Sequence, residues 1–298
     1  MLPAVIRIEG TGKDAVRVLI HGAVALVLVG MVPARALGNG HGPVYGLATP
    51  TLGKGAWSLD LAVMGASGDR DMAMFRPMLG YGITQDLQVS VSLPMPLYTT
   101  MGSSPSRMMT MMPATPDVEV LIGYRFHRTA PKVGARFEST AYGGLLYPTD
   151  STMAGVDTSP GVYGAVVTGY ASRTVYAWVG GLYRRYMTPS GEGAHHPGDV
   201  AMYSVVVGYR PKPFRKDYPS PDWRVFVEVV GEHTAKDLVA GNEMTNTGGH
   251  QIFVGPTVLG LYGSWGISGG PVFRVYDDLN GVQPKDKVRM VLNFTYWF

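Results

Sequence analysis

The stretch from Val288 to Phe298, VRMVLNFTYWF, decides the fold class of this chain. Its apolar residues occupy every second position and oppose a set that includes Arg289, Asn293 and Thr295. An alternation with period two is typical of a β-strand whose two faces meet different surroundings. The chain therefore ends in a strand with one apolar and one polar face.

The same alternation recurs toward the N-terminus. In residues 86–94, for example, apolar residues at 87, 89, 91 and 93 alternate with polar ones. After residue 36, no segment offers the roughly 20 consecutive apolar residues of a membrane-spanning helix. The pattern predicts about twelve strands, which begin near Ala56, Ala73, Asp86, Asp117, Lys132, Gly161, Thr174, Val200, Trp223, Gly249, Ser264 and Val288.

The connections between these strands differ in length at the two ends. Long loops are expected at 65–72, 94–116, 143–160, 187–199, 233–248 and 276–287. Tight turns are expected at 84–85, 127–131, 171–173 and 261–263, with the proline-rich 210–222 as the exception. This asymmetry is typical of outer-membrane barrels. We predict an all-β fold, a transmembrane antiparallel up-and-down β-barrel of about twelve strands that covers residues 56–298.

Tryptophans give an independent indication of a membrane. Trp57, Trp223, Trp265 and Trp297 all fall at strand ends on the side of the tight turns. Indole rings prefer the membrane interface, so these residues are expected to form an aromatic girdle. Core packing at the strand starts is the alternative.

Composition excludes several other classes of protein. Only 16% of the 298 residues are charged, against roughly 25% in soluble domains, and 40 are glycine. The chain is too apolar for a disordered protein and too rich in glycine for a helical bundle. Cysteine is absent, which excludes disulfide scaffolds, thiolate metal sites and cysteine nucleophiles.

The N-terminus resembles an export signal. Residues 1–36 combine a basic leader, an apolar run from Val18 to Val32 that is too short to span a bilayer, and Ala34-x-Ala36, which matches a signal-peptidase site. A membrane anchor is the alternative. We predict that residues 1–36 are cleaved, that 37–55 form a periplasmic segment, and that the protein resides in the bacterial outer membrane. Of 25 basic and 22 acidic residues, 21 and 20 then remain, which removes the electrostatic support for nucleic-acid binding.

The carboxy terminus supplies the most specific local signal. A terminal Phe298 preceded by Phe294 and Tyr296 at alternate positions resembles the assembly signal of bacterial outer-membrane barrels. The expected partners are accordingly the barrel-assembly machinery and the lipid of the outer membrane.

If the apolar faces meet lipid, the alternate residues line the lumen. The charged members of that set are Asp60, Arg76, Glu119, Arg125, Arg136, Glu138, Arg224, Glu228, Glu232 and Arg289. Isolated charges in a confined lumen cost several kcal/mol each, so these residues must be paired or hydrated. Two interpretations stay open: a structural salt-bridge lattice, or a selectivity filter or solute site. About twelve strands lie between the eight that side chains can fill and the sixteen of open porins, which indicates a narrow or gated pore.

Enzymatic and metal chemistry find little support. After removal of the leader, the histidines are at 41, 127, 195, 196, 233 and 250. They stand beside no nucleophile motif, and His195-His196 is expected to be solvated. The Met-rich stretch Met108, Met109, Met111 and Met112 could bind Cu(I) through soft thioethers, or could pack as an adaptable apolar filler. No catalytic residues and no cofactor are expected.

Three segments carry a family resemblance: Gly46–Gly53, Arg76–Ile83 and Val133–Glu138. They resemble a group of uncharacterised bacterial outer-membrane proteins related to the transporters named for the meta-pathway of phenol degradation. The resemblance covers roughly residues 42–298 and implies a transporter-like barrel without an agreed substrate. We therefore expect a passive channel for small, possibly hydrophobic, solutes, the alternative being a structural or copper-handling barrel without an open pore.

Overall fold

The structure, a computed structural model, describes residues 42–69, 71–99, 117–147, 160–187, 195–215 and 220–298. The chain divides into two compact units, Met1–Arg35 and Ala36–Phe298, and all described residues belong to the second. The predicted leader, residues 1–36, lies outside the described residues, and its cleavage stays a prediction. None of the helices formed by the described residues has the length and apolar character to cross a membrane.

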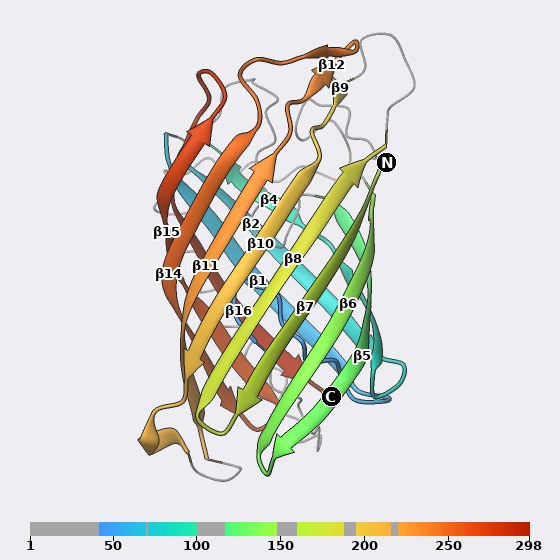
Figure 1. The fold of residues 1–298 in the computed structure, drawn as a ribbon, viewed down its shortest axis with the longest axis vertical. Helices are drawn as coiled ribbons and strands as arrows, with labels where there is room; N and C mark the ends of the chain where they lie inside the picture. The colour runs from blue at the N-terminus through green and yellow to red at the C-terminus, as the bar shows by residue number, and fades with distance from the viewer. Residues whose placement is uncertain (1–41, 70, 100–116, 148–159, 188–194, 216–219) are drawn as a thin grey trace, which may run out of the picture. The chain divides into compact units, whose positions relative to one another are not determined.

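The second unit is a closed antiparallel β-barrel (Figure 1). It closes because β1 pairs with β2 on one side and with β16 on the other. The short strands β3 and β4 pair with successive parts of β2 and share one place in the wall, so the barrel has twelve strands. The wall strands are β1 (Trp57–Gly68), β2 (Met72–Gly82), β3 (Leu87–Ser92) with β4 (Met95–Thr99), β5 (Val118–Lys132), β6 (Ala135–Tyr147), β7 (Gly161–Ser172), β8 (Val175–Tyr186), β10 (Val200–Tyr209), β11 (Asp222–Thr234), β14 (Gly249–Tyr262), β15 (Trp265–Leu279) and β16 (Asp286–Trp297).

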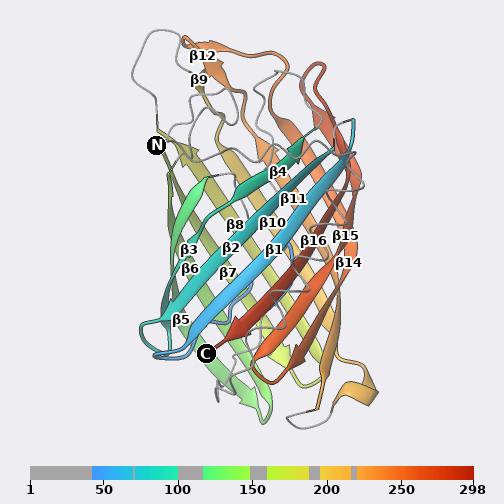
Figure 2. The same cartoon turned by 180° about the vertical axis from the view of Figure 1, so that it is seen from behind.

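These bounds confirm the predicted fold class and strand order. Each predicted strand start lies within three residues of the observed one. The seam between the first and the last strand ends on a pair of backbone bonds: Trp57 N donates to Phe298 O at 2.8 Å, and Phe298 N donates to Trp57 O at 3.2 Å. Figure 2 shows this seam, where β1 and β16 lie side by side.

Alternation along the strands separates an outer from an inner face. Exposed and buried side chains alternate along β10. The exposed ones are Tyr203, Val205, Val207 and Tyr209, and the buried ones at the alternate positions are Val200, Met202, Ser204 and Val206. Because the sheet is closed, the buried set faces the barrel interior. The exposed outer face is rich in Val, Leu and aromatic side chains, as expected of a wall that meets lipid.

The ends of the barrel differ, but two predicted connections were wrong. Residues 65–72 were expected to form a long loop, yet the β1–β2 ladder continues to the pair Ala66 and Met72. The tight turn expected at 127–131 lies instead between Lys132 and Ala135, because β5 absorbs its proline through two bulges and stays paired with β6. The turn at the β10–β11 connection contains the 3-10 helix η2 (Lys212–Phe214).

At the end with the longer connections, a small second sheet lies outside the barrel wall. It consists of β9 (His195–His196), β12 (Leu238–Val239) and β13 (Asn242–Glu243). It lies at the top of Figure 1, opposite the C-terminus. The carboxy terminus therefore shares the end of the barrel with the tight turns. We call the two ends the loop end and the turn end.

Three of the four tryptophans at the turn end fit the predicted girdle. Trp57, Trp223 and Trp265 are partly exposed on the outer face. Trp297 is buried, because it lies on the inward face of β16 together with Thr295 and Val291. The core-packing alternative therefore holds for Trp297.

The barrel interior is filled rather than open over much of its length. One cluster of buried apolar side chains gathers Met64, Met72, Met74 and Met202 around Tyr45. A second cluster, nearer the turn end, contains Trp178 and Phe226. Inward glycines make room for such rings: a Cβ on Gly144 would meet the Tyr163 ring at 2.1 Å. Protein therefore occupies space that an open pore would leave to water.

Candidate functional site

Residues 42–53, which precede β1, lie inside the barrel. We call them the inner segment. Tyr45, Thr49, Thr51 and Leu52 of this segment are buried, and only Lys54 and Gly55, at the turn end, are exposed before β1 begins. The segment contains no charged residue. It belongs to the site because it crosses the lumen that any solute would have to pass.

Glu228 on β11 anchors the start of the inner segment. Its carboxylate accepts three consecutive backbone N–H groups, from Val44 at 2.7 Å, Tyr45 at 2.8 Å and Gly46 at 2.7 Å. The Thr257 hydroxyl on β14 donates a further short hydrogen bond to the same carboxylate. Glu228 is fully buried, and this set of donors takes the place of water around its charge.

Tyr45 ties the inner segment to the opposite part of the wall. Its hydroxyl donates to the carbonyl oxygens of Gly270 at 2.8 Å and Arg289 at 3.0 Å. The Gly270 carbonyl lies where the β14–β15 pairing is interrupted and where Pro256 and Pro271 supply no N–H group.

The rest of the inner segment is bound by side chains of several strands. Thr49 O accepts from the Thr140 hydroxyl at 2.6 Å, and Ala48 O accepts from the Tyr142 hydroxyl at 2.6 Å. Trp178 Nε1 donates to Thr49 Oγ1 at 3.1 Å, and Leu52 N donates to Gln88 Oε1 at 2.8 Å. The inner segment forms no helix or strand, so these bonds to the wall satisfy its polar groups instead.

Of the segment 37–55, which was predicted to be periplasmic, the structure describes residues 42–55 and places 42–53 inside the barrel; a periplasmic location stays a prediction. Every bond described above joins the inner segment to a strand far away in the sequence, so local pattern could not reveal the arrangement. One signal was present: a run from Gly42 to Gly53 without charge is unusual for a solvated linker.

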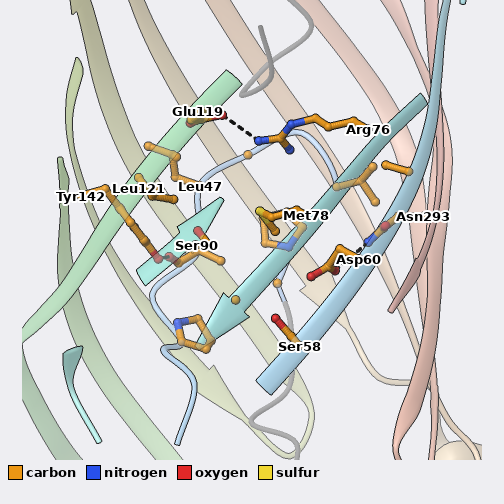
Figure 3. Close-up of a pocket in the computed structure, with 18 of the residues that line it drawn as sticks. Leu47, Ser58, Asp60, Arg76, Met78, Ser90, Glu119, Leu121, Tyr142 and Asn293 are labelled. Carbon is orange, nitrogen blue, oxygen red and sulfur yellow. Dashed lines mark hydrogen bonds and ion pairs between the residues drawn. The ribbon is translucent and has the colours of Figure 1, made fainter. Parts of the chain in front are cut away.

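A cavity of about 260 Å³ remains between the inner segment and the wall. Its polar lining includes Ser58 and Asp60 of β1, Arg76 of β2, Glu119 of β5 and Asn293 of β16. Figure 3 shows these residues around the space, with Leu47 of the inner segment on one side and Met78 of β2 on another. Arg76 Nη2 and Glu119 Oε2 are 2.8 Å apart and form an ion pair in its lining, and the Tyr163 hydroxyl also donates to Glu119.

The ten predicted lumen charges separate into groups along the barrel. At the turn end, Glu138 lies within 3.0 Å of Arg125, 3.2 Å of Arg136 and 3.8 Å of Arg128. Arg224, at the same end, pairs with Asp222 at 2.7 Å. The structure therefore does not bring all ten residues into one ring.

Nearer the loop end, Arg289 pairs with Glu232 and with Asp286, both at 3.1 Å. Its guanidinium also lies 4.1 Å from the centroid of the Phe253 ring. Between these groups lie Asp60, Glu228 and the Arg76–Glu119 pair. Whether any of these charges sets selectivity stays a prediction.

The remaining sequence candidates fall in different places. His195 was expected to be solvated but is half-buried, with Nε2 3.1 Å from Asp237 Oδ2 in the loop-end sheet. Among the described residues, no group of three His, Cys, Asp or Glu could hold a metal ion. Met108, Met109, Met111 and Met112 lie outside the described residues.

The carboxy-terminal residues lie at the seam. Phe294 and Tyr296 face Leu61 and Leu59 across the β1–β16 ladder. Phe298 is exposed, and its ring stacks on Trp57 with a centroid distance of 6.3 Å. Their role in assembly stays a prediction.

Comparison with known proteins supports the fold. No family model and no curated protein matches the chain. Among solved structures, the COG4313 outer membrane channel from Pseudomonas putida F1 aligns with a TM-score of 0.61 at 11% identity, over 84% of this chain and 98% of that one. The NanC porin aligns with a TM-score of 0.48 at 10% identity, over 80% and 98%. The resemblance to the phenol-degradation transporters stays a prediction.

Proposed function

We propose that this protein is a bacterial outer-membrane channel for small solutes and that its inner segment is the gate. The observation that carries the proposal is the inner segment itself. It crosses the lumen without joining the sheet, and it is held by hydrogen bonds from separate strands. Such bonds contribute roughly 0.5–1.5 kcal/mol each and can be broken one at a time.

The closed sheet and the apolar outer face of the barrel support a membrane location. A closed barrel satisfies its backbone hydrogen bonds within the sheet, which lipid requires. The outer face exposes Val207, Val227 and Leu292, each more than half exposed. The likeness in fold to an outer membrane channel supports the same location. With short turns on the periplasmic side, the C-terminus would face the periplasm.

Passage through the barrel requires two movements. The inner segment has to leave its partners on β3, β6, β8 and β11. The buried methionines near Tyr45 also have to repack, and methionine suits this because it is unbranched and flexible. A twelve-stranded barrel admits only small solutes even then.

A deletion tests the proposal. A variant that lacks residues 42–52 should conduct more ions in planar bilayers than the wild type and should swell liposomes faster in small sugars. Heat-modifiable migration on gels checks that the variant barrel is folded. If neither the folded variant nor the wild type admits ions or sugars, the protein is not a channel.

A closed barrel that handles a soft metal is the second candidate, and the buried methionines favour it. Met64 and Met74 are direct cross-strand partners on β1 and β2, and both face the interior. Thioether ligands select Cu(I) over harder cations. Titration of the purified barrel with Ag(I), a stable mimic of Cu(I), should release heat that is lost in a Met64→Leu/Met74→Leu variant. No heat from the wild type would exclude this candidate.

A further inference from the structure

Asp60 differs from the other acidic residues of the barrel interior. Glu119, Glu138, Glu232 and Asp286 each lie within 3.2 Å of an arginine nitrogen. Glu228 has its backbone donors instead. Asp60 lines the cavity and is only 7% exposed. In the described part of the chain, no cationic side chain lies within ion-pair distance of its carboxylate.

The hydrogen bonds of Asp60 leave part of its carboxylate for a ligand. Oδ1 accepts from Asn293 Nδ2 at 3.2 Å and from the Thr295 hydroxyl at 2.5 Å. Oδ2 accepts no hydrogen bond from any described residue. Figure 3 shows the carboxylate turned toward the space between Ser58 and Met78. A buried anion without a counter-charge is costly, so a cation at this oxygen would be stabilised.

A second unsatisfied group lies beside it. Asn293 Oδ1 is buried and has no hydrogen-bond partner among the described residues. Asn293 also lines the cavity, as does the Ser58 hydroxyl. The cavity lining therefore combines the Asp60 carboxylate with the polar side chains of Ser58 and Asn293, and a group with several N–H donors suits such a lining.

The same cavity has an apolar side. Leu52, Met64, Met78 and Val291 belong to its lining. A metal cation with its hydration shell does not match such a surface, whereas a short hydrocarbon chain does.

We propose that this cavity binds the ammonium group of a small organic amine, with the ammonium at Asp60 and the carbon chain against Met78 and Leu52. The proposal rests on the proposed function, because the solute has to enter from the lumen. It names a class of solute, small amphipathic amines, that the channel would carry or sense.

Binding in detergent micelles tests the site without requiring conduction. Saturation-transfer NMR should detect propylammonium on the wild-type barrel. The Asp60→Asn variant should raise its dissociation constant at least tenfold, whereas Asp71→Asn, which neutralises an exposed carboxylate near the loop end, should leave it unchanged. Equimolar 1-propanol and KCl should compete poorly.

A second variant keeps Asp60 intact. Met78 is the direct cross-strand partner of Asp60, so Met78→Lys places an ammonium within reach of the carboxylate. This variant should abolish propylammonium binding and raise the melting temperature. Equal binding of KCl would show an inorganic cation site and overturn the proposal, as would binding that persists in folded Asp60→Asn. If propylammonium binds but neither the wild type nor the deletion variant conducts, the amine site at Asp60 is supported and the proposed channel function is wrong.

Discussion

The carboxylate of Glu228 lies 2.8 Å from the backbone nitrogen of Tyr45, although the two residues are 183 positions apart in the chain. Two neighbouring N–H groups of the inner segment point to the same carboxylate. A single side chain of the wall therefore holds one end of the inner segment.

Glu228→Gln should loosen the inner segment. The amide keeps the shape of the carboxylate but loses the charge and turns one acceptor oxygen into a donor that faces backbone N–H groups. Hydrogen bonds to a charged group contribute about 1.5–3 kcal/mol each. We expect more frequent opening events in single-channel recordings. Glu243→Gln, on an exposed residue at the loop end, is the control and should record like the wild type.

A disulfide should lock the inner segment in place. A Cβ built on Gly46 lies 3.4 Å from the Cβ of Ser204, close to disulfide geometry, and the chain contains no other cysteine. Gly46→Cys/Ser204→Cys also needs Val206→Ala, because a Val206 methyl lies 2.5 Å from the new Cβ. Conductance should be low when oxidised and should rise on addition of dithiothreitol. Equal currents in both states would show that the inner segment does not gate.

The arginines around Glu138 should differ in their effects. Arg136 is more exposed than Arg125 and makes one contact with Glu138, so Arg136→Ala should leave the barrel folded and shift the reversal potential toward cation preference. Arg125 is buried and binds Asp86, Glu138 and the Gln85 carbonyl. Arg125→Ala should therefore cost about 3–5 kcal/mol of stability. Melting temperature and reversal potential of the two purified variants separate these roles.

Removal of Phe298 should impair assembly. Its backbone forms the last two hydrogen bonds of the β1–β16 seam, and its ring stacks on Trp57. The deletion should reduce folded protein in the outer membrane, measured by heat-modifiable migration. Phe273→Ala, on another exposed phenylalanine of the outer face, is the matched control. Normal yield of the deletion variant would remove the assembly role of the terminus.

The strands of the barrel wall were predictable because the alternation of apolar and polar residues is visible within each strand. Residues such as Leu292 and Asn293 reveal their faces through their immediate neighbours, and the ladder then follows from strand order. Two of the three errors in the wall arose where geometry is not local, and the third was the loop expected at 65–72, where the β1–β2 ladder continues. The bulges in β5 let the strand run past Pro131, and the inward turn of Trp297 follows from register rather than from residue type.

The contents of the lumen were only half predictable. Alternation assigned Glu138 and Arg289 to a face that is buried in the structure, but could not tell which charges would meet. No pattern near Val44 or Tyr45 in the sequence predicts that Glu228 accepts their backbone hydrogen bonds. Asp60 likewise cannot be separated from Glu119 by sequence alone, since the difference is that Arg76 pairs with Glu119 on the inner face of the wall.

The pairing of β1 with β16 has a consequence for the order of events during biogenesis. The seam can form only after Phe298 has been synthesised, whereas the inner segment directly precedes β1 and is made long before it. The open sheet can therefore close around a segment that is already present. The hydrogen bonds of the inner segment to β6, β8 and β11 would then be available to position these strands before β16 pairs with β1.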